Sequence, residues 1–281
     1  MTVAVVTGAN QGLGFALAAG LAERLEPADL VLLTGRNPER VQAAAASLAS
    51  ARARVEGRVL DVSSPEDVAA FAKAVGAVDI VISNASAMLT PERSQAAQVD
   101  EFVAVANGGA QAVLRSFGPI SRPGGRLIVV ASSLGTLGRL DPRVQPLLDG
   151  VSLDEVSRVV DEWVASVHDG TAVSRGWPEW INIPSKVAQV AAVRAVAAER
   201  RERDLAEGTL VAAVCPGLVD TPLSRPWFED FSQARTPAAA AVPILDLVFA
   251  PVDPARYGEL IRDGEVLPWR SGRPVQVAKA N

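Results

Sequence analysis

Short apolar runs alternate with longer alanine-rich stretches along most of this 281-residue sequence. The runs have the length and composition of buried strands and fall at residues 2–7, 29–34, 55–60, 78–82, 124–131 and 209–214. The stretches between them have helical length and cover residues 12–25, 38–49, 65–74, 98–117 and 184–200. Alternating strands and helices form βαβ units, whose right-handed crossovers place helices on both faces of a parallel sheet. We therefore predict an α/β fold with a doubly wound parallel sheet.

One stretch interrupts this alternation. Residues 134–182, about fifty in all, separate the fifth strand from the helix near residue 184. Within them Ser152-Leu153-Asp154-Glu155 has the form of a capping box, which predicts an amphipathic helix over 153–168. Such a segment is usually functional, and it would lie near the carboxyl ends of the strands, where α/β sheets bind ligands. No repeat or low-complexity linker divides the chain, so we expect one domain, 1–281, with 134–182 as an insert near the active site.

The composition excludes several classes of function. The net charge of −5 and the pI near 5.1 argue against a nucleic-acid partner held through its phosphates. The single cysteine, Cys215, cannot form an intrachain disulfide, and with one histidine, His168, it leaves no zinc site of the usual kind. The sequence has no basic leader and no run of 18 apolar residues. We expect a cytoplasmic protein with no metal and no membrane partner.

A glycine-rich turn follows the first strand and opens the first predicted helix. Glycines permit a tight turn and let the backbone approach a pyrophosphate, which then sits on the helix N-terminus. An ordinary strand–helix turn is the alternative, but the strand–turn–helix context is the one that a dinucleotide site requires. The predicted cofactor residues of this turn are Gly8, Asn10, Gln11, Gly12, Leu13 and Gly14.

The residue after the second strand indicates which dinucleotide binds. That strand ends in Gly35-Arg36-Asn37. In NAD sites an acidic residue here binds the ribose hydroxyls, whereas an arginine suits a 2′-phosphate. The chain has 24 arginines and only three lysines, so a solvated surface arginine is the alternative interpretation. We favour NADP(H), with Arg36 at the 2′-phosphate.

Further segments resemble the short-chain dehydrogenase/reductase family. Asp61-Val62 resembles the family's adenine-contacting pair, and Ser83-Asn84-Ala85-Ser86 stands where the family has a turn after strand four. Asn107 resembles a helix asparagine that supports a proton-relay water beside a lysine. Ser132-Ser133 ends the fifth strand, where the family's catalytic serine is expected. The stretch 215–221 resembles the Pro-Gly loop that holds the nicotinamide end of the cofactor.

The resemblance extends over about residues 3–270 and implies a Rossmann-like sheet with strand order 3-2-1-4-5-6-7. It also implies further cofactor contacts from Asp61, Val62, Asn84, Ala85, Lys186, Pro216, Gly217, Val219 and Thr221. The long insert, followed by Gly176-Trp177-Pro178, is similar to that of the monomeric carbonyl reductases. In those enzymes the insert covers the face that other members use to assemble, so the resemblance implies a monomer that acts on a small-molecule substrate.

The family's catalytic tyrosine is missing from its expected place. That tyrosine stands four residues before the lysine, whereas this chain reads Asn182-Ile183-Pro184-Ser185-Lys186. Tyr257, the single tyrosine, lies far downstream. Hydride delivery to a ketone creates an alkoxide, and an amide side chain can donate a hydrogen bond to it but cannot release a proton near neutral pH. Asn182 either contacts the substrate in this way or caps the helix that starts there.

Other side chains are candidates for contacts with the substrate. Ser133 is the expected catalytic serine, with Ser132 as the alternative if the register slips by one. Lys186 is also a candidate to pass a proton through Asn107 and water, and His168 has a suitable pKa range, although a lone histidine at a helix end is more often a surface residue. Three tryptophans are expected to flank the pocket, either stacking on a flat substrate or serving in packing: Trp177, Trp180 and Trp227.

Three functional hypotheses fit this pattern. The first is an NADPH-dependent reductase of a carbonyl, enone or quinone-type substrate, including polycyclic aromatic ones, that works without the tyrosine. The second is a non-redox cyclase, dehydratase or epimerase on the same scaffold, and the third is a nucleotide-binding protein without catalysis. All three require the same nucleotide site. We favour the first, with Ser133, Asn182, Lys186 and Asn107 as its catalytic residues.

Overall fold

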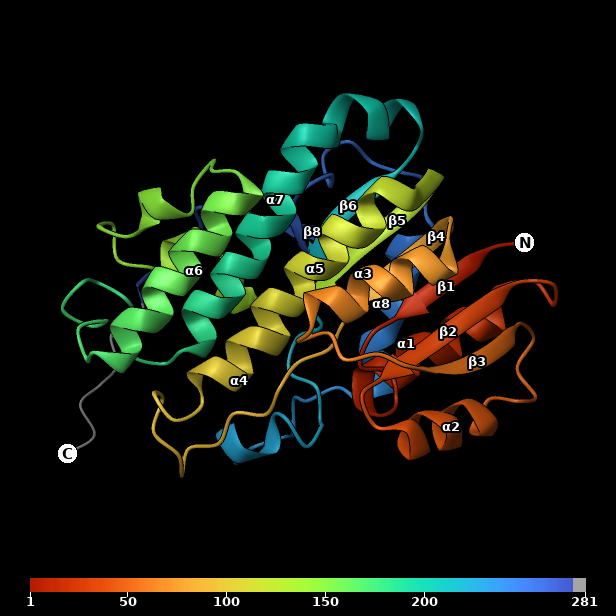
Figure 1. Ribbon diagram of the computed structural model, residues 1–281, viewed down its shortest axis with the longest axis horizontal. Coiled ribbons are helices and arrows are strands. Elements are labelled where there is room, and N and C mark those ends of the chain that lie inside the picture. The colour runs from red at the N-terminus through yellow and green to blue at the C-terminus, as the bar shows by residue number, and fades with distance from the viewer. Residues whose placement is uncertain (275–281) are drawn as a thin grey trace.

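The computed structural model, described over residues 1–274, is built on an eight-stranded sheet with helices on both faces (Figure 1). The strands are β1 (Val3–Val6), β2 (Leu30–Gly35), β3 (Arg54–Val59), β4 (Val78–Ser83), β5 (Ser121–Val130), β6 (Leu210–Val214), β7 (Leu260–Arg262) and β8 (Glu265–Leu267). Their order is β3-β2-β1-β4-β5-β6-β7-β8, and every neighbouring pair is parallel except β7 and β8. The predicted α/β class and strand order 3-2-1-4-5-6-7 are confirmed, with β8 as an additional strand.

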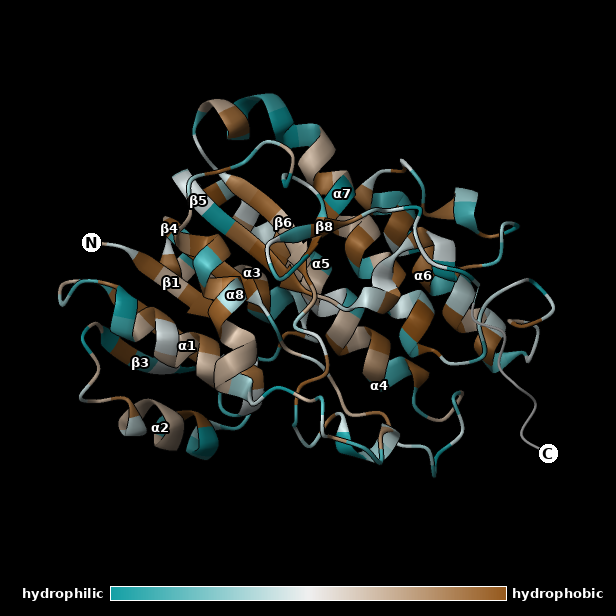
Figure 2. Cartoon of the chain, turned by 180° about the vertical axis from the view of Figure 1, so that it is seen from behind, coloured by the Kyte–Doolittle hydropathy of each residue, from teal (hydrophilic) through white to brown (hydrophobic). Residues whose placement is uncertain are grey.

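Eight α-helices lie within residues 1–274. They are α1 (Gly12–Arg24), α2 (Pro38–Ser47), α3 (Pro65–Val75), α4 (Val99–Val103), α5 (Gly109–Phe117), α6 (Leu153–His168), α7 (Asn182–Ala206) and α8 (Pro237–Phe249). Helix α1 packs against α8 on one face of the sheet, and α3, α5 and α7 pack side by side on the other (Figures 1 and 2). Among these residues, no helix combines the length and apolarity needed to cross a membrane.

The central strands lie in the middle of the hydrophobic core, and apolar helix residues pack on them. Every residue of β1 and of β6 is buried, as expected for a parallel sheet covered on both faces. Figure 2 shows β1, β4 and β6 in the centre of the sheet as mostly hydrophobic, whereas the edge strand β3 is largely hydrophilic. The glycine turn, the Ser132-Ser133 segment and the Pro-Gly loop follow β1, β5 and β6, so all three lie at the carboxyl edge of the sheet.

The opposite, amino-terminal edge of the sheet is held by a half-buried arginine. Arg126 of β5 makes five hydrogen bonds to backbone carbonyls at distances of 2.6 to 3.0 Å. Those carbonyls belong to β5, to the loop before β6 and to the C-terminal end of α8, namely Gly124, Gly125, Gly208, Val248 and Ala250. Burial lowers the pKa of this guanidinium, which pairs with no carboxylate in residues 1–274. One side chain therefore ties together three segments that are distant in sequence.

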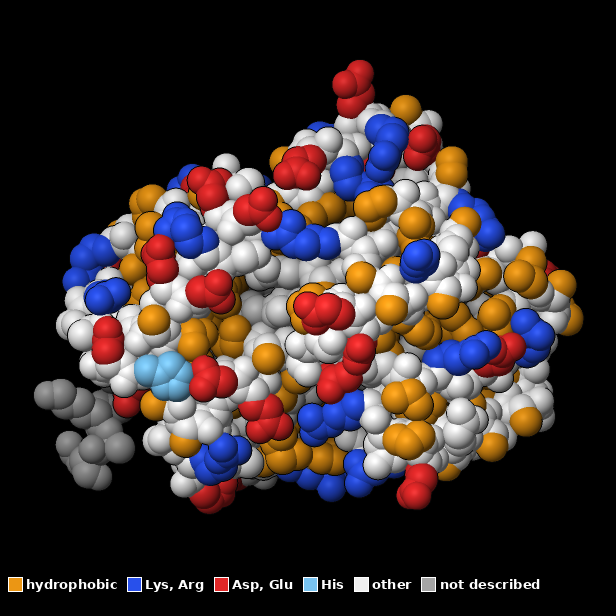
Figure 3. Space-filling view, viewed as in Figure 1, with side chains coloured by type: hydrophobic (Ala, Val, Ile, Leu, Met, Phe, Trp, Pro, Cys, Tyr) orange, Lys and Arg blue, Asp and Glu red, His pale blue; other side chains and the backbone are white. Residues whose placement is uncertain are grey.

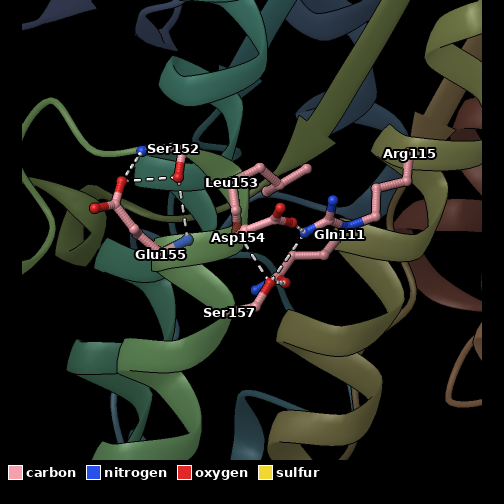
Figure 4. Close-up of polar contacts among 7 residues, drawn as sticks. All are labelled: Gln111, Arg115, Ser152, Leu153, Asp154, Glu155 and Ser157. Atoms are coloured by element: carbon pink, nitrogen blue, oxygen red, sulfur yellow. Dashed lines mark hydrogen bonds and ion pairs between the residues drawn. The ribbon is translucent and has the colours of Figure 1, made fainter.

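The insert after β5 carries the predicted helix. Helix α6 spans Leu153–His168, as expected, and begins with a complete capping box between Ser152 and Glu155. It packs along α7, and its first turn also contacts α5 (Figures 1 and 4). There the Ser157 hydroxyl donates to Gln111, and Arg115 forms a 2.6 Å ion pair with Asp154.

The apolar side of α6 stabilises this docking more than its polar contacts do. The Arg115–Asp154 pair is exposed, and exposed ion pairs contribute only about 0–1 kcal/mol. By contrast, Leu153, Val156, Val160 and Trp163 are buried, and burying each such side chain contributes about 1.5–3 kcal/mol. The insert is therefore a packed part of the molecule.

Candidate active site

The glycine turn between β1 and α1 requires its glycines. Gly8 and Gly12 have φ angles of +62° and +58°, a region that other residues rarely adopt. A Cβ atom on Gly14 would lie 2.4 Å from Asn84 Nδ2 and 2.4 Å from the Gly8 carbonyl oxygen. The backbone of this turn is thus packed too tightly to admit side chains at these positions. Without side chains there, a ligand can approach the backbone N–H groups of the turn.

The N-terminus of α1 is left without a cap. The cap residue, Gln11, makes no side-chain hydrogen bond to the helix, and the first turn contains no acidic residue. Four other helices are each capped by a side chain, namely that of Asn37, Ser64, Ser152 or Thr236. The first N–H groups of α1 and the positive end of its dipole therefore suit an anion such as a pyrophosphate.

The two residues that follow β4 hold the glycine turn in place through hydrogen bonds. The backbone N–H groups of Asn84 and Ala85 both donate to Thr7 Oγ1, at 2.9 and 3.1 Å. The Asn84 amide donates to the carbonyls of Thr7 and Gly8, at 3.0 and 3.2 Å. Both N–H groups of that amide are thus bonded to the turn, so Asn84 and Ala85 form the floor of the expected cofactor site.

Two arginines lie beside the turn at the carboxyl end of β2. Arg36 and Arg40 are exposed, and within the described chain neither forms an ion pair. Arg40 lines an open hollow of about 430 Å³ together with Asn10 and Gln11 of the glycine turn. The guanidinium groups of Arg36 and Arg40 have no carboxylate partner among the described residues, so they are available to bind a phosphate group at this corner, beside the glycine turn.

The Asp61-Val62 pair lies at the same corner. Hydrogen bonds from the Ser63 hydroxyl and N–H lower the pKa of the Asp61 carboxyl, and the charge of Arg36 contributes to the same shift. Val62 is buried, and a Cβ on Gly109 would lie 2.8 Å from its Cγ2 atom. The structure thus places Asp61 near Arg36 and uses the Val62 side chain in packing.

The Pro216-Gly217 turn brings a second loop to the glycine turn. Gly217 has a φ angle of +78° directly after β6. Val219 is buried and forms a short β-bridge with Arg235. The methyl group of Thr221 lies 3.5 Å from the position of a Cβ on Gly12. Loops that follow β1 and β6 therefore meet at the carboxyl edge of the sheet.

The first turn of α7 is fixed to the chain before α5 by a pair of hydrogen bonds. The Asn107 amide donates to the Ser185 carbonyl at 2.9 Å, and the Ser185 hydroxyl donates back to Asn107 Oδ1 at 2.6 Å. Asn107 lies in a π-helical turn, Ala104–Gly108, where the helix widens. Because Ser185 precedes Lys186, this contact sets the position of the lysine.

Asn182 is the first residue of α7, but it does not cap the helix. The cap residue is Ile181, and no side-chain cap hydrogen bond forms. The interpretation of Asn182 as an N-cap is therefore wrong. The residue is half-buried, and its amide makes no hydrogen bond to another described residue. The amide is thus available to a ligand.

The two serines after β5 differ in their hydrogen bonds. Ser132 Oγ accepts the Leu134 N–H at 3.2 Å and caps the short helix Ser133–Gly135. The Ser133 hydroxyl has no hydrogen-bond partner within the described residues. The short helix packs directly on α7, since a Cβ on Gly135 would lie 2.8 Å from the Lys186 carbonyl oxygen. Ser133 thus lies on a segment in contact with the start of α7.

Comparison with known proteins agrees with this geometry. A protein-family model described as short chain dehydrogenase matches residues 2–141. Carbonyl reductase (NADPH) 1 of Mus musculus is 26% identical over 278 residues, covering 95% of this chain and 98% of its own. Carbonyl reductase (NADPH) 3 of Rattus norvegicus is 27% identical with the same two coverages. The chain belongs to the short-chain dehydrogenase family. It is accordingly placed among the oxidoreductases.

Solved structures share the fold of this chain. Salutaridine reductase from Papaver somniferum superposes with a TM-score of 0.77 at 20% identity, covering 92% of this chain and 99% of its own. A metagenomic short-chain oxidoreductase, solved in complex with NADP, gives a TM-score of 0.62 at 22% identity and covers 98% and 97% of the two chains. Both comparisons support the sheet order described above.

The single tyrosine does not lie near the short-chain dehydrogenase site. Tyr257 is buried, and its hydroxyl donates to Asp204 Oδ2 at 2.8 Å, near the C-terminal end of α7. Asp204 lies 22 residues after Asn182 on this helix, or about 33 Å at 1.5 Å per residue. His168 lies on the surface, where Nε2 is 2.8 Å from Asp100 Oδ1. Neither side chain stands in for an acid beside Lys186.

The three tryptophans fall into two groups. Trp177 is 6% exposed and packs against Trp163 of α6 with ring centroids 6.0 Å apart, so it stabilises the insert. Trp180 and Trp227 are half-buried and pack on each other at 5.1 Å, bringing the start of α7 to the loop after β6. The Trp227 indole N–H donates to the Leu89 carbonyl at 2.9 Å. Only Trp180 and Trp227 remain candidates for the substrate pocket.

Four residues that shape the site were not predicted from the sequence. Thr7, Arg40, Ser185 and Gln189 all have contacts that shape it. Gln189 carried a signal, because it is a polar residue three positions after Lys186 in an otherwise apolar helical stretch. Thr7 and Ser185 gave none, since their partners lie 77 and 78 residues away.

Proposed function

We propose that this short-chain dehydrogenase is an NADPH-dependent reductase of a carbonyl, enone or quinone-type substrate, including polycyclic aromatic ones, and works without a tyrosine acid. One observation supports the proposal: Asn182, whose amide makes no hydrogen bond to the described residues, lies four residues before Lys186, and we assign it to the place of the family's tyrosine. Its side chain donates a hydrogen bond but releases no proton at neutral pH.

NADP(H) fits the residues at the carboxyl edge of the sheet. The uncapped α1 suits a pyrophosphate, and the unpaired charge of Arg36 suits a 2′-phosphate. The names of the mouse and rat relatives include NADPH, and the metagenomic oxidoreductase was solved with NADP. The bound cofactor supplies the hydride. We assign its binding to Gly8, Asn10, Gln11, Gly12, Leu13, Gly14, Arg36, Asp61, Val62, Asn84, Ala85, Lys186, Pro216, Gly217, Val219 and Thr221.

The proposed catalytic side chains determine which substrates the enzyme can reduce. Ser133 Oγ and the Asn182 amide each donate a hydrogen bond to the oxygen that gains negative charge, while Asn107 positions the turn that carries Lys186. Losing a positioned general acid typically costs a factor of about 10²–10⁴ in rate. Substrates that yield a delocalised enolate or phenolate avoid this loss, because such an anion is stable enough to leave and take a proton from water. The site therefore favours enones and quinones over simple ketones.

The surroundings of the site support a small-molecule substrate and a monomer. Trp180 and Trp227 present half-buried rings beside the start of α7, which suits a flat substrate. Helix α6 of the insert 134–182 packs along α7 and contacts α5 through Gln111 and Arg115, so the side of α7 that it covers is closed to a second copy (Figure 4). Acidic and basic side chains are interspersed on the face seen in Figure 3, which offers no broad basic surface for a nucleic acid. We further propose one domain over 1–281 and a cytoplasmic location.

The experiment compares NADPH oxidation by the wild type, Asn182→Tyr and Asn182→Phe with quinones, enones and simple ketones. The wild type is expected to reduce the conjugated acceptors. Asn182→Tyr is expected to gain about 10²–10⁴-fold on simple ketones, because it restores a proton donor. Asn182→Phe adds the ring without the hydroxyl and is expected to gain nothing.

Two results would contradict the proposal. Equal gains by the Tyr and Phe variants would show that ring size, and not acid chemistry, limits ketone reduction. NADPH binding without oxidation by any acceptor would favour a non-redox enzyme or a nucleotide-binding protein.

A further inference from the structure

Gln189 is a buried polar residue in an apolar part of α7. It is 3% exposed, and its neighbours Val187, Ala188 and Val190 are also buried. Burying an amide is unfavourable unless each of its polar atoms finds a partner. The contacts of Gln189 therefore indicate what this side chain does.

Both ends of the Gln189 amide are bonded. Its Nε2 atom donates to the Ala106 carbonyl at 2.7 Å, and its Oε1 atom accepts from the Lys186 ammonium at 2.7 Å. Ala106 lies in the π-helical turn Ala104–Gly108, where the Gly109 N–H bonds to the Ala104 carbonyl five residues back. A carbonyl accepts and an ammonium only donates, so the two partners fix the amide in this one orientation.

The surroundings of Lys186 leave Gln189 as its main protein contact. In residues 1–274 the ammonium makes no ion pair, and the titratable group that acts on it electrostatically is Cys215, at the end of β6. Burial lowers the pKa of Lys186 from its ordinary 10.5 to about 8. Because the glutamine oxygen accepts a stronger, charge-assisted hydrogen bond from the protonated amine than from the neutral one, it favours the charged form.

We propose that Gln189 is a positioning residue that holds the Lys186 ammonium at the nucleotide site and prevents proton transfer from the lysine to the π-helical turn. This inference rests on the proposed function and deepens it. The carboxamide of Gln189 bridges the Lys186 ammonium and the Ala106 carbonyl, directly beside Asn107, and an amide neither gives nor takes a proton near neutral pH. The Asn107 amide is bonded on both sides to Ser185. Lys186 therefore acts as a fixed cation for the cofactor, in keeping with substrates that need no internal acid.

The low lysine content makes this coupling measurable without the cofactor. The chain has three lysines, Lys73, Lys186 and Lys279, so NMR of protein labelled with ¹³C,¹⁵N-lysine gives three side-chain signals. Lys73 is exposed, and Lys279 lies outside the described residues. The Lys186 signal is the one lost in Lys186→Arg, and its pH titration reports on the ammonium directly.

Three variants separate positioning from packing. Gln189→Leu keeps the volume but removes the acceptor, so the Lys186 midpoint is expected to fall by about one pH unit or more. Gln189→Glu supplies a charged acceptor and is expected to raise it. Gln111→Leu is the matched control, because Gln111 is a buried glutamine of α5 whose bond goes to Ser157 and not to the lysine. The Lys186 titration midpoint in Gln111→Leu is expected to equal that of the wild type.

NADPH affinity at pH 7, measured by calorimetry, completes the test. Gln189→Leu is expected to weaken binding about 10-fold or more, as for a lost bond to a charged group, and Gln111→Leu is expected to leave it unchanged. Equal Lys186 midpoints in the wild type, Gln189→Leu and Gln189→Glu would overturn the inference, and Gln189→Glu decides alone if the leucine variant does not fold. Moved midpoints in a protein that binds no NADPH would support the Gln189–Lys186 contact and overturn the proposed function.

Discussion

Removing one oxygen atom from Tyr257 is expected to destabilise the protein and leave its chemistry intact. The Tyr257 hydroxyl donates at 2.8 Å to Asp204, a carboxylate that is 0% exposed. Arg200 also holds this carboxylate, through two bonds of 2.9 and 3.1 Å, and Arg203 contributes a third cationic contact at 3.2 Å. The substitution Tyr257→Phe removes the phenol and leaves these arginines in place.

The expected magnitude follows from these contacts. A hydrogen bond to a charged group contributes about 1.5–3 kcal/mol. Because the two arginines still neutralise Asp204, the loss stays below the roughly 3–5 kcal/mol that follows when a buried charge loses its ionic partner. The free energy of unfolding is therefore expected to fall by about 1.5–3 kcal/mol, with Tm lower by roughly 3–10 °C.

Urea denaturation of the wild type, Tyr257→Phe, Asp204→Asn and the double variant measures this coupling. The two single effects are expected to be non-additive, since both remove the charge-assisted bond between the Tyr257 phenol and the Asp204 carboxylate. NADPH binding and kcat are expected to stay unchanged in Tyr257→Phe, because the phenol lies at the far end of α7 from Lys186. Lost activity at unchanged stability would refute the reasoning and make Tyr257 a catalytic group.

The pH dependence of stability tests the contact between Asp204 and Tyr257 at both acid and alkaline pH. Hydrogen bonds from Arg200 and Tyr257 lower the pKa of Asp204 against the opposing effect of burial, so its contribution is present above about pH 4 and is lost as pH falls below that. Burial beside Asp204 raises the pKa of Tyr257, so the phenol's contribution is present below about pH 10 and is lost as pH rises above it. In Tyr257→Phe the alkaline loss is expected to be smaller.

Three further variants test other parts of the structure. Gly14→Ala adds a methyl group 2.4 Å from a backbone oxygen, so unfolding free energy is expected to fall by about 1–3 kcal/mol and NADPH binding to be lost in calorimetry. Gly108→Ala, which meets only one atom at 3.8 Å, is the control and is expected to keep both. Arg36→Leu is expected to weaken NADPH about 10-fold while NADH binding stays constant, and equal losses would refute a 2′-phosphate contact. Ser152→Ala removes the capping box of α6 and is expected to cost about 1 kcal/mol in urea denaturation; unchanged stability would contradict the role of the cap.

Local sequence signals were sufficient for most of the sheet and for the insert helix. The strands and helix α6 were predicted because buried apolar runs and a capping box act over a few residues, whereas the strand order followed from the resemblance to the short-chain dehydrogenase/reductase family. Helix α8 was missed because Pro243 lies inside it and Pro237 begins it, which hides a helical pattern. The expected helix over 98–117 is divided by the π-helical turn at Ala104–Gly108.

The hairpin of β7 and β8 is indicated in the sequence by an Asp-Gly pair, which is typical of tight hairpin turns. Asp263-Gly264 joins the two strands, and both residues have positive φ angles, 52° and 83°, as a tight hairpin turn requires. Lys186 was singled out through the resemblance of Asn182-Ile183-Pro184-Ser185-Lys186 to the family's catalytic segment. The partners of its side chain were not predicted, because Gln189 and Ala106 meet only where α7 crosses the chain before α5, 83 residues apart.

The backbone contacts of Arg126 have a consequence for how this protein can change. It binds the backbone of three segments at the amino-terminal edge of the sheet, whereas the proposed cofactor and substrate residues lie on loops at the carboxyl edge. Backbone carbonyls are present whatever the side chains are, so this anchor does not depend on the sequence of the segments it joins. The loops at the other edge are therefore free to exchange residues in evolution or in the laboratory, and a new substrate range is attainable there without rebuilding the scaffold.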